Sequence, residues 1–157
     1  MKNFILTVLI TMICTVTNAQ NFKALAKYEF KTEESYQSER NKVLECANYL
    51  FNNPVVKDDV NRLVSIQYII KWMSGTPDYT FEITKEVTDL IGKGQKLMGL
   101  YLAGMTKVVL EDDDKELSSD EIYSKVKDLL VAYCSDPKNN IKPSKAIKKI
   151  IKSKNKA

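Results

Sequence analysis

Residues 60–79, VNRLVSIQYIIKWMSGTPDY, are the stretch that decides the fold of this chain. On a helical wheel, at about 100° per residue, the apolar side chains of its first part fall into two stripes. One stripe is Val60, Val64, Tyr68 and Trp72, and the other is Leu63, Ile66, Ile70 and Met73. A surface helix has one apolar stripe, so two stripes predict a helix packed between neighbours. Gly75 and Pro77 are expected to end it, Gly as a left-handed cap residue and Pro because it cannot continue a helix. We therefore expect a central, two-faced helix at about 58–74, which carries the only tryptophan of the chain, Trp72.

Further segments of the chain have helical spacing between turn signals, and all four prolines fall outside them. These segments are residues 32–52, 84–91, 95–110, 118–135 and 144–151. Tyr79, Phe81 and Ile83 alternate with polar residues, which predicts an extended piece laid across the core. Because no hairpin signal is present, the sequence predicts an all-α fold. We expect a compact bundle of about five to six helices in a single domain.

The first residues have the anatomy of a secretory signal peptide. Lys2 precedes an apolar run at 4–16, and Thr17-Asn18-Ala19 supplies small residues ahead of a cut before Gln20. The run is shorter than the ~20 residues that span a bilayer. We expect residues 1–19 to be removed near Ala19, which leaves a periplasmic or secreted chain with no transmembrane segment.

The mature chain divides by composition into a helical domain, 20–137, and a lysine-rich C-terminal segment with a short helix, 138–157. The second part holds eight of the 24 Lys and Arg residues and none of the 20 acids. The lysines placed on its short helix are Lys145, Lys148, Lys149 and Lys152. Such a segment binds an anionic surface or folds back onto the acidic body, and both alternatives stay open. Nucleic acid is not expected as a partner, because the segment lacks aromatic side chains for base stacking.

The numbers of cysteines and histidines limit the kinds of catalysis and metal binding that the chain can support. After cleavage two cysteines remain, Cys46 and Cys134. Export permits a disulfide between them, and two free buried thiols are the alternative. The chain has no histidine, which excludes histidine-based acid–base or nucleophilic catalysis and histidine-ligated metals. We assign no catalytic residue, no metal and no cofactor.

Three short clusters could bind a ligand. Trp72, Asp78 and Tyr79 surround the turn after the central helix and could form a small pocket, with core packing as the alternative. Residues 92–96, GKGQK, could cradle an anion at a helix start but lack the full phosphate-loop pattern. The acidic run at 111–121 departs from a calcium loop where glycine and the bidentate glutamate are required, so we expect a solvated loop.

Four short sequence segments resemble those of a known group of proteins. They are NRL at 61–63, WMSGTPDYTF at 72–81, GLY at 99–101 and DPKNN at 136–140. With these the chain resembles small exported proteins of unknown function found in Bacteroidota. The resemblance implies a bacterial envelope setting and no particular activity.

We expect an exported, non-enzymatic helical domain that binds an unknown protein partner or has a structural role at the bacterial envelope. The first alternative is a binder of anionic surfaces through the lysine-rich segment. The second is a carboxylate-based hydrolase, which would need two carboxylates about 5–10 Å apart in a cleft. The sequence does not indicate which two acidic residues would form such a catalytic pair.

Overall fold

The computed structural model describes residues 22–112 and 117–156. In these residues the chain forms helices and no strand, so the predicted all-α bundle in one domain is confirmed. The elements are η1 (Phe22–Lys27), α1 (Glu33–Ser38), α2 (Arg40–Asn52), α3 (Val60–Met73), α4 (Lys85–Ile91), α5 (Gln95–Glu111), α6 (Ser119–Ser135), η2 (Pro137–Asn139) and α7 (Lys145–Lys154). None of the helices in this part of the chain is long and apolar enough to cross a bilayer. The predicted signal peptide, 1–19, lies outside the described residues.

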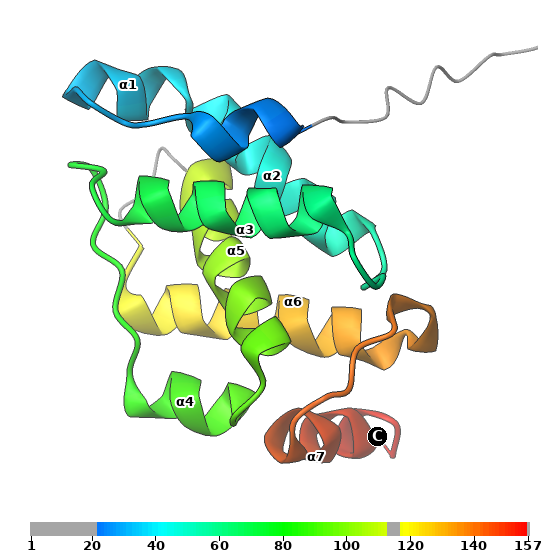
Figure 1. The fold of residues 1–157 in the computed structure, drawn as a ribbon. Helices are drawn as coiled ribbons and strands as arrows, with labels where there is room; N and C mark the ends of the chain where they lie inside the picture. Colours follow the sequence, from blue (N-terminus) through cyan, green and yellow to red (C-terminus); the bar gives the residue numbers. More distant parts are fainter. Residues whose placement is uncertain (1–21, 113–116, 157) are drawn as a thin grey trace, which may run out of the picture.

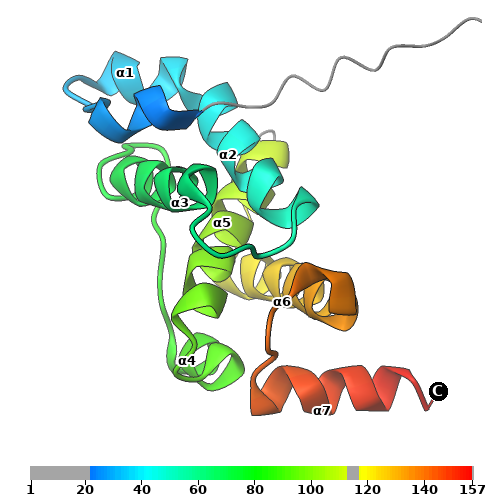
Figure 2. The same ribbon diagram turned by 45° about the vertical axis from the view of Figure 1, so that its right-hand side comes forward.

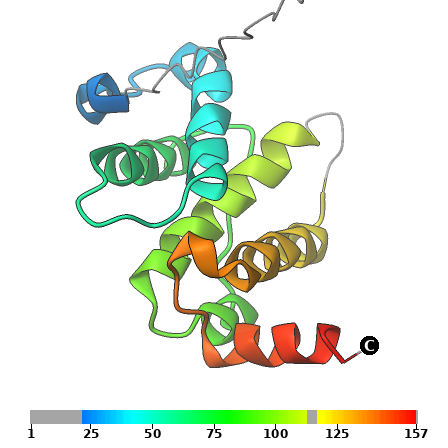
Figure 3. The ribbon, with the colours of Figure 1, turned by 90° about the vertical axis from the view of Figure 1, so that its right-hand side faces the viewer.

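Helix α5 runs through the middle of the bundle (Figures 1 and 3). It packs against α2 and α3 on one side and against α6 on the other, while η1 lies on α3. Figure 2 shows α7 beneath α6, where it also contacts α4. The core is therefore shared by α3 and α5 and does not surround α3 alone.

Small residues on α5 allow its neighbours to approach closely. A side chain at Gly99 would place its Cβ 2.9 Å from Ile66 Cδ1 on α3. At Gly104 the Cβ would lie 2.7 Å from Val126 Cγ1 on α6. Distances below about 3 Å are overpacked, so α5 can sit between two helices only because these positions carry no side chain.

Side-chain caps mark the starts of several helices. Asp59 accepts a hydrogen bond from the Arg62 backbone N–H at 2.9 Å, and Ser118 forms a capping box with Glu121. The Ser144 hydroxyl caps α7 by accepting a hydrogen bond from the Ile147 backbone N–H at 3.0 Å. These starts agree with the sequence expectation, since a cap is a local interaction.

Two local details differ from expectation. The first predicted helix is divided at Glu39, whose backbone (φ −94°, ψ 1°) separates α1 from α2. Gly75 does not adopt a left-handed conformation. Its missing side chain instead makes room for Tyr36, whose hydroxyl would lie 2.1 Å from a Cβ at this position.

The lysine-rich segment packs onto the body. Ile147 of α7 is fully buried, while Ile150 and Ile151 are half-buried. Lys154 pairs with Asp128 on α6 at 3.0 Å. The segment is thus part of the folded domain, because its isoleucines face α4 and α6.

Candidate functional site

The aromatic turn after α3 is built around a core residue. Trp72 is fully buried, and its Nε1 donates a hydrogen bond to the Tyr36 carbonyl at 3.0 Å. Tyr79 is half-buried and lies with its ring centroid 5.8 Å from that of Trp72. Asp78 is exposed and accepts a hydrogen bond from Gln37. The turn therefore anchors α1 to the end of α3, and the Trp72 ring offers no face to a ligand.

Helix α3 leaves an apolar surface uncovered. Val60, Leu63 and Ile70 are 48, 57 and 42% exposed, and Val56 in the preceding loop is 57% exposed. We call these four residues the α3 stripe. Positions 60, 63 and 70 lie on one helix face, with the exposed Gln67 between Leu63 and Ile70.

The buried side of α3 differs from the two stripes expected from sequence. Ile69 is 1% exposed and belongs to the core, although the two-stripe pattern omits it. Leu63 and Ile70 of the second stripe remain about half exposed, while Ile66 from the same stripe packs against Gly99. The helix is therefore covered on one side and only partly on the other.

The four predicted binding lysines of α7 lie on its outer side. We call Lys145, Lys148, Lys149 and Lys152 the lysine face. All four side chains are exposed, and none is paired with an acid of the described residues. Because the isoleucines of α7 face inward, the charges face solvent together.

The two cysteines are separate, buried thiols, Cys46 on α2 and Cys134 on α6. Burial raises the pKa of Cys46 to about 12 and that of Cys134 to about 11. Both thiols are therefore protonated at neutral pH, which suppresses nucleophilic and redox chemistry.

The remaining sequence clusters are arranged as follows. Asp112 pairs with Lys125 at 2.6 Å, while 113–116 lie outside the described residues. Lys93 and Lys96 line an open groove together with Lys142 of the C-terminal segment. No group of three potential metal ligands occurs in the residues that the structure describes.

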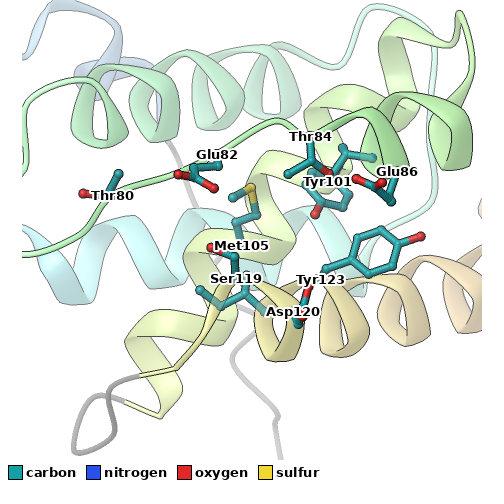
Figure 4. Close-up of a pocket in the computed structure, with 11 residues that line it drawn as sticks. Thr80, Glu82, Thr84, Glu86, Tyr101, Met105, Ser119, Asp120 and Tyr123 are labelled. Carbon is teal, nitrogen blue, oxygen red and sulfur yellow. The ribbon is translucent and has the colours of Figure 1, made fainter.

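A small cavity lies where the extended segment after the α3 turn crosses α5 (Figure 4). Its volume is about 80 Å³. The lining residues are Thr80, Glu82, Thr84, Glu86, Val87, Tyr101, Met105, Ser119, Asp120, Ile122 and Tyr123. We call it the Tyr101 cavity, after the residue of α5 on its inner wall.

The Tyr101 cavity was not predicted from the sequence. Tyr101 has the spacing of an ordinary core residue of α5. The alternation at 79–84 identified the inward aromatic residues, but the alternate positions Thr80, Glu82 and Thr84 are those that line the cavity. The alternation predicts that these three residues share one face of the extended segment. It cannot predict that this face lies next to α6, because that contact depends on the tertiary fold.

The chain was compared with known proteins in three ways. No protein-family model, no curated protein and no solved structure matches it. The assignment of function therefore rests on the geometry of this chain.

Proposed function

We propose that this chain is an exported, non-enzymatic helical domain that binds a protein partner at the bacterial envelope through the α3 stripe. The observation that carries the proposal is the exposure of Leu63, at 57%, beside Val60 and Ile70 on one helix face. Clustered exposed apolar side chains are typical of interaction sites, whereas single ones are ordinary.

The spacing of the stripe indicates the kind of partner. Val60, Leu63, Gln67 and Ile70 follow a 3–4–3 pattern, which is the seam that a second helix packs against. An amphipathic helix of the partner protein would bury the stripe with its own apolar residues. The expected signal peptide at 1–19 and the resemblance to exported Bacteroidota proteins support the envelope as the place of binding.

The carboxylate hydrolase alternative has less support. The Tyr101 cavity is lined by acids, but its 80 Å³ are well below the ~300 Å³ at which small-molecule sites begin. The pKa of Glu86 is lowered by a hydrogen bond from the Thr84 side chain. A general acid of a glycoside hydrolase needs a raised pKa.

Capture from an envelope extract tests the proposal. The baits are the chain 20–157, the variant Leu63→Glu/Ile70→Glu, and a control with two charges on other exposed helix positions, Asn41→Glu/Ser124→Glu. We expect one partner to be retained by the unaltered chain and the control but not by the stripe variant, and the purified partner to repeat this pattern.

Equal retention by the stripe variant would contradict the proposal. So would a stable dimer of the unaltered chain in light scattering that the stripe variant abolishes, because the stripe would then bind a second copy of the chain.

A second candidate function is binding to an anionic surface. The observation that favours it is the lysine face, four exposed lysines on a docked helix with no acid partner among the described residues. Each lysine near an anionic membrane surface contributes ~1 kcal/mol, and the attraction fades as salt screens it.

Co-sedimentation with anionic vesicles at low and physiological salt tests this candidate. Replacing the four lysines with glutamine is preferable to removing the segment, because truncation would also remove the buried Ile147. We expect binding at low salt that the glutamine variant loses. Equal sedimentation of the two proteins would contradict a role for the lysine face.

A further inference from the structure

The Tyr101 cavity is formed by parts of the chain far apart in sequence (Figure 4). Glu82 approaches it from the segment that leads into α4, Glu86 from the first turn of α4, and Asp120 from the first turn of α6. Tyr101 of α5 lies between these two sides. The site is thus assembled only in the folded domain.

The hydroxyl of Tyr101 has an unused hydrogen-bonding capacity. The residue as a whole is 1% exposed, and within the described residues its hydroxyl makes no hydrogen bond. Since this hydroxyl borders a cavity, a ligand group can satisfy it. Burial raises the pKa of Tyr101 to about 12, so the hydroxyl is neutral and can accept a hydrogen bond from a cation.

The charge around the cavity selects a cation. Glu82, Glu86 and Asp120 line it, and no lysine or arginine in the described part of the chain does. The lowered pKa of Glu86 keeps this carboxyl ionised at neutral pH. An anion would therefore be repelled from the site.

The other lining residues favour a ligand with an apolar part over a bare metal ion. The acids do not converge into a set of three potential metal ligands in the described residues. Val87, Met105 and Ile122 supply an apolar wall, which suits methylene groups. The volume of about 80 Å³ accommodates the end of an alkyl chain and is too small for a drug-sized molecule.

We propose that the Tyr101 cavity binds a primary alkylammonium group, with the ammonium between Glu82, Asp120 and the Tyr101 hydroxyl and its methylene groups against Met105 and Ile122. A free alkylamine and a lysine side chain of a protein present the same chemistry. The site is separate from the α3 stripe and does not depend on the function proposed there.

Titrations followed by NMR test the proposal, with n-butylammonium as the probe and n-butanol as the neutral control of similar size. We expect n-butylammonium to shift the methyl signals of Met105 and Ile122, and n-butanol to bind at least tenfold more weakly. Nα-acetyl-lysine methylamide is the second probe: tighter binding than n-butylammonium indicates a lysine side chain as the source, and weaker binding indicates a free amine.

Two variants make the test specific. Tyr101→Phe should weaken n-butylammonium about tenfold, the effect of one hydrogen bond to a charged group, while the free energy of unfolding is unchanged or rises. Glu82→Gln/Asp120→Asn should abolish the binding. Equal binding of n-butanol, unchanged binding in Tyr101→Phe, or no shift of the Met105 and Ile122 signals would each overturn the proposal.

Discussion

Arg62 is the buried charge whose removal tests the packing of α2 against α3 most severely. Its guanidinium is inside the protein, with the residue 9% exposed. Nη2 donates hydrogen bonds to the carbonyls of Asn53 at 2.7 Å and Leu50 at 3.1 Å, at the end of α2. Nε lies 3.7 Å from Oδ2 of Asp59, the cap of α3. The side chain therefore joins the end of one helix to the start of the next.

We expect Arg62→Met to lower the free energy of unfolding by about 3–4 kcal/mol. Met keeps most of the apolar stem, so the loss comes from the polar contacts. Removing one member of a buried ion pair destabilises by ~3–5 kcal/mol. The loss should lie in the lower part of that range, because the Asn53 carbonyl also accepts a hydrogen bond from the Tyr133 hydroxyl at 2.6 Å and keeps a partner.

Urea unfolding followed by circular dichroism measures this difference. Gln67→Met is the matched control, since Gln67 is exposed on the same helix and its change should stay within ~0.5 kcal/mol. A double-mutant cycle with Tyr133→Phe should give a coupling energy of at least ~0.5 kcal/mol, because both side chains contact the Asn53 carbonyl. A loss below ~1 kcal/mol for Arg62→Met would refute this reasoning.

Further predictions concern the core, the titrating groups, the thiols and processing. Trp72→Ala should destabilise by ~3–5 kcal/mol in the same assay, and a loss near ~1 kcal/mol would place the ring outside the core. Burial raises the pKa of Cys46 and of Tyr101 to about 12, so above about pH 9 the unfolded chain releases protons that the folded chain retains. The free energy of unfolding should therefore be insensitive to these groups at neutral pH and fall between about pH 9 and 12, by at most ~1.4 kcal/mol per pH unit and group; a flat profile there would contradict it. Thiol titration of denatured, periplasm-derived protein should find Cys46 and Cys134 both reactive, whereas no reactive thiol would mean a disulfide. Intact mass should show Gln20 as the first residue after export, and an uncut chain in the membrane fraction would indicate a retained anchor.

Helix positions were predictable from the sequence because their signals are local. The side chains of Asp59, Ser118 and Ser144 cap helices where the sequence indicates them. The break at Glu39 was not predictable, since no proline or glycine marks it. The role of Gly75 also depends on tertiary structure, because its partner, Tyr36, lies on another helix.

The surfaces that carry the functional proposals were less predictable. Periodicity identified Leu63 and Ile70 as an apolar stripe, but it cannot tell whether a neighbouring helix covers them. The lysine face was predictable from the composition of the C-terminal segment. The burial of Ile147 against the body was not, because it depends on the tertiary structure. The Tyr101 cavity needs the approach of two segments that no sequence signal brings together.

The central claim is that the outer face of α3 is uncovered and available to a partner, and charge insertion measures this directly. The free energy of unfolding should fall by no more than ~1 kcal/mol per substitution in Leu63→Glu/Ile70→Glu, because the two side chains are already 57 and 42% exposed. Val64 lies on the buried side of the same helix and is 4% exposed. Val64→Glu should therefore lower the free energy of unfolding by several kcal/mol, because it buries a charge. If the stripe variant is destabilised as strongly as Val64→Glu, the stripe is covered within the domain and the claim is contradicted.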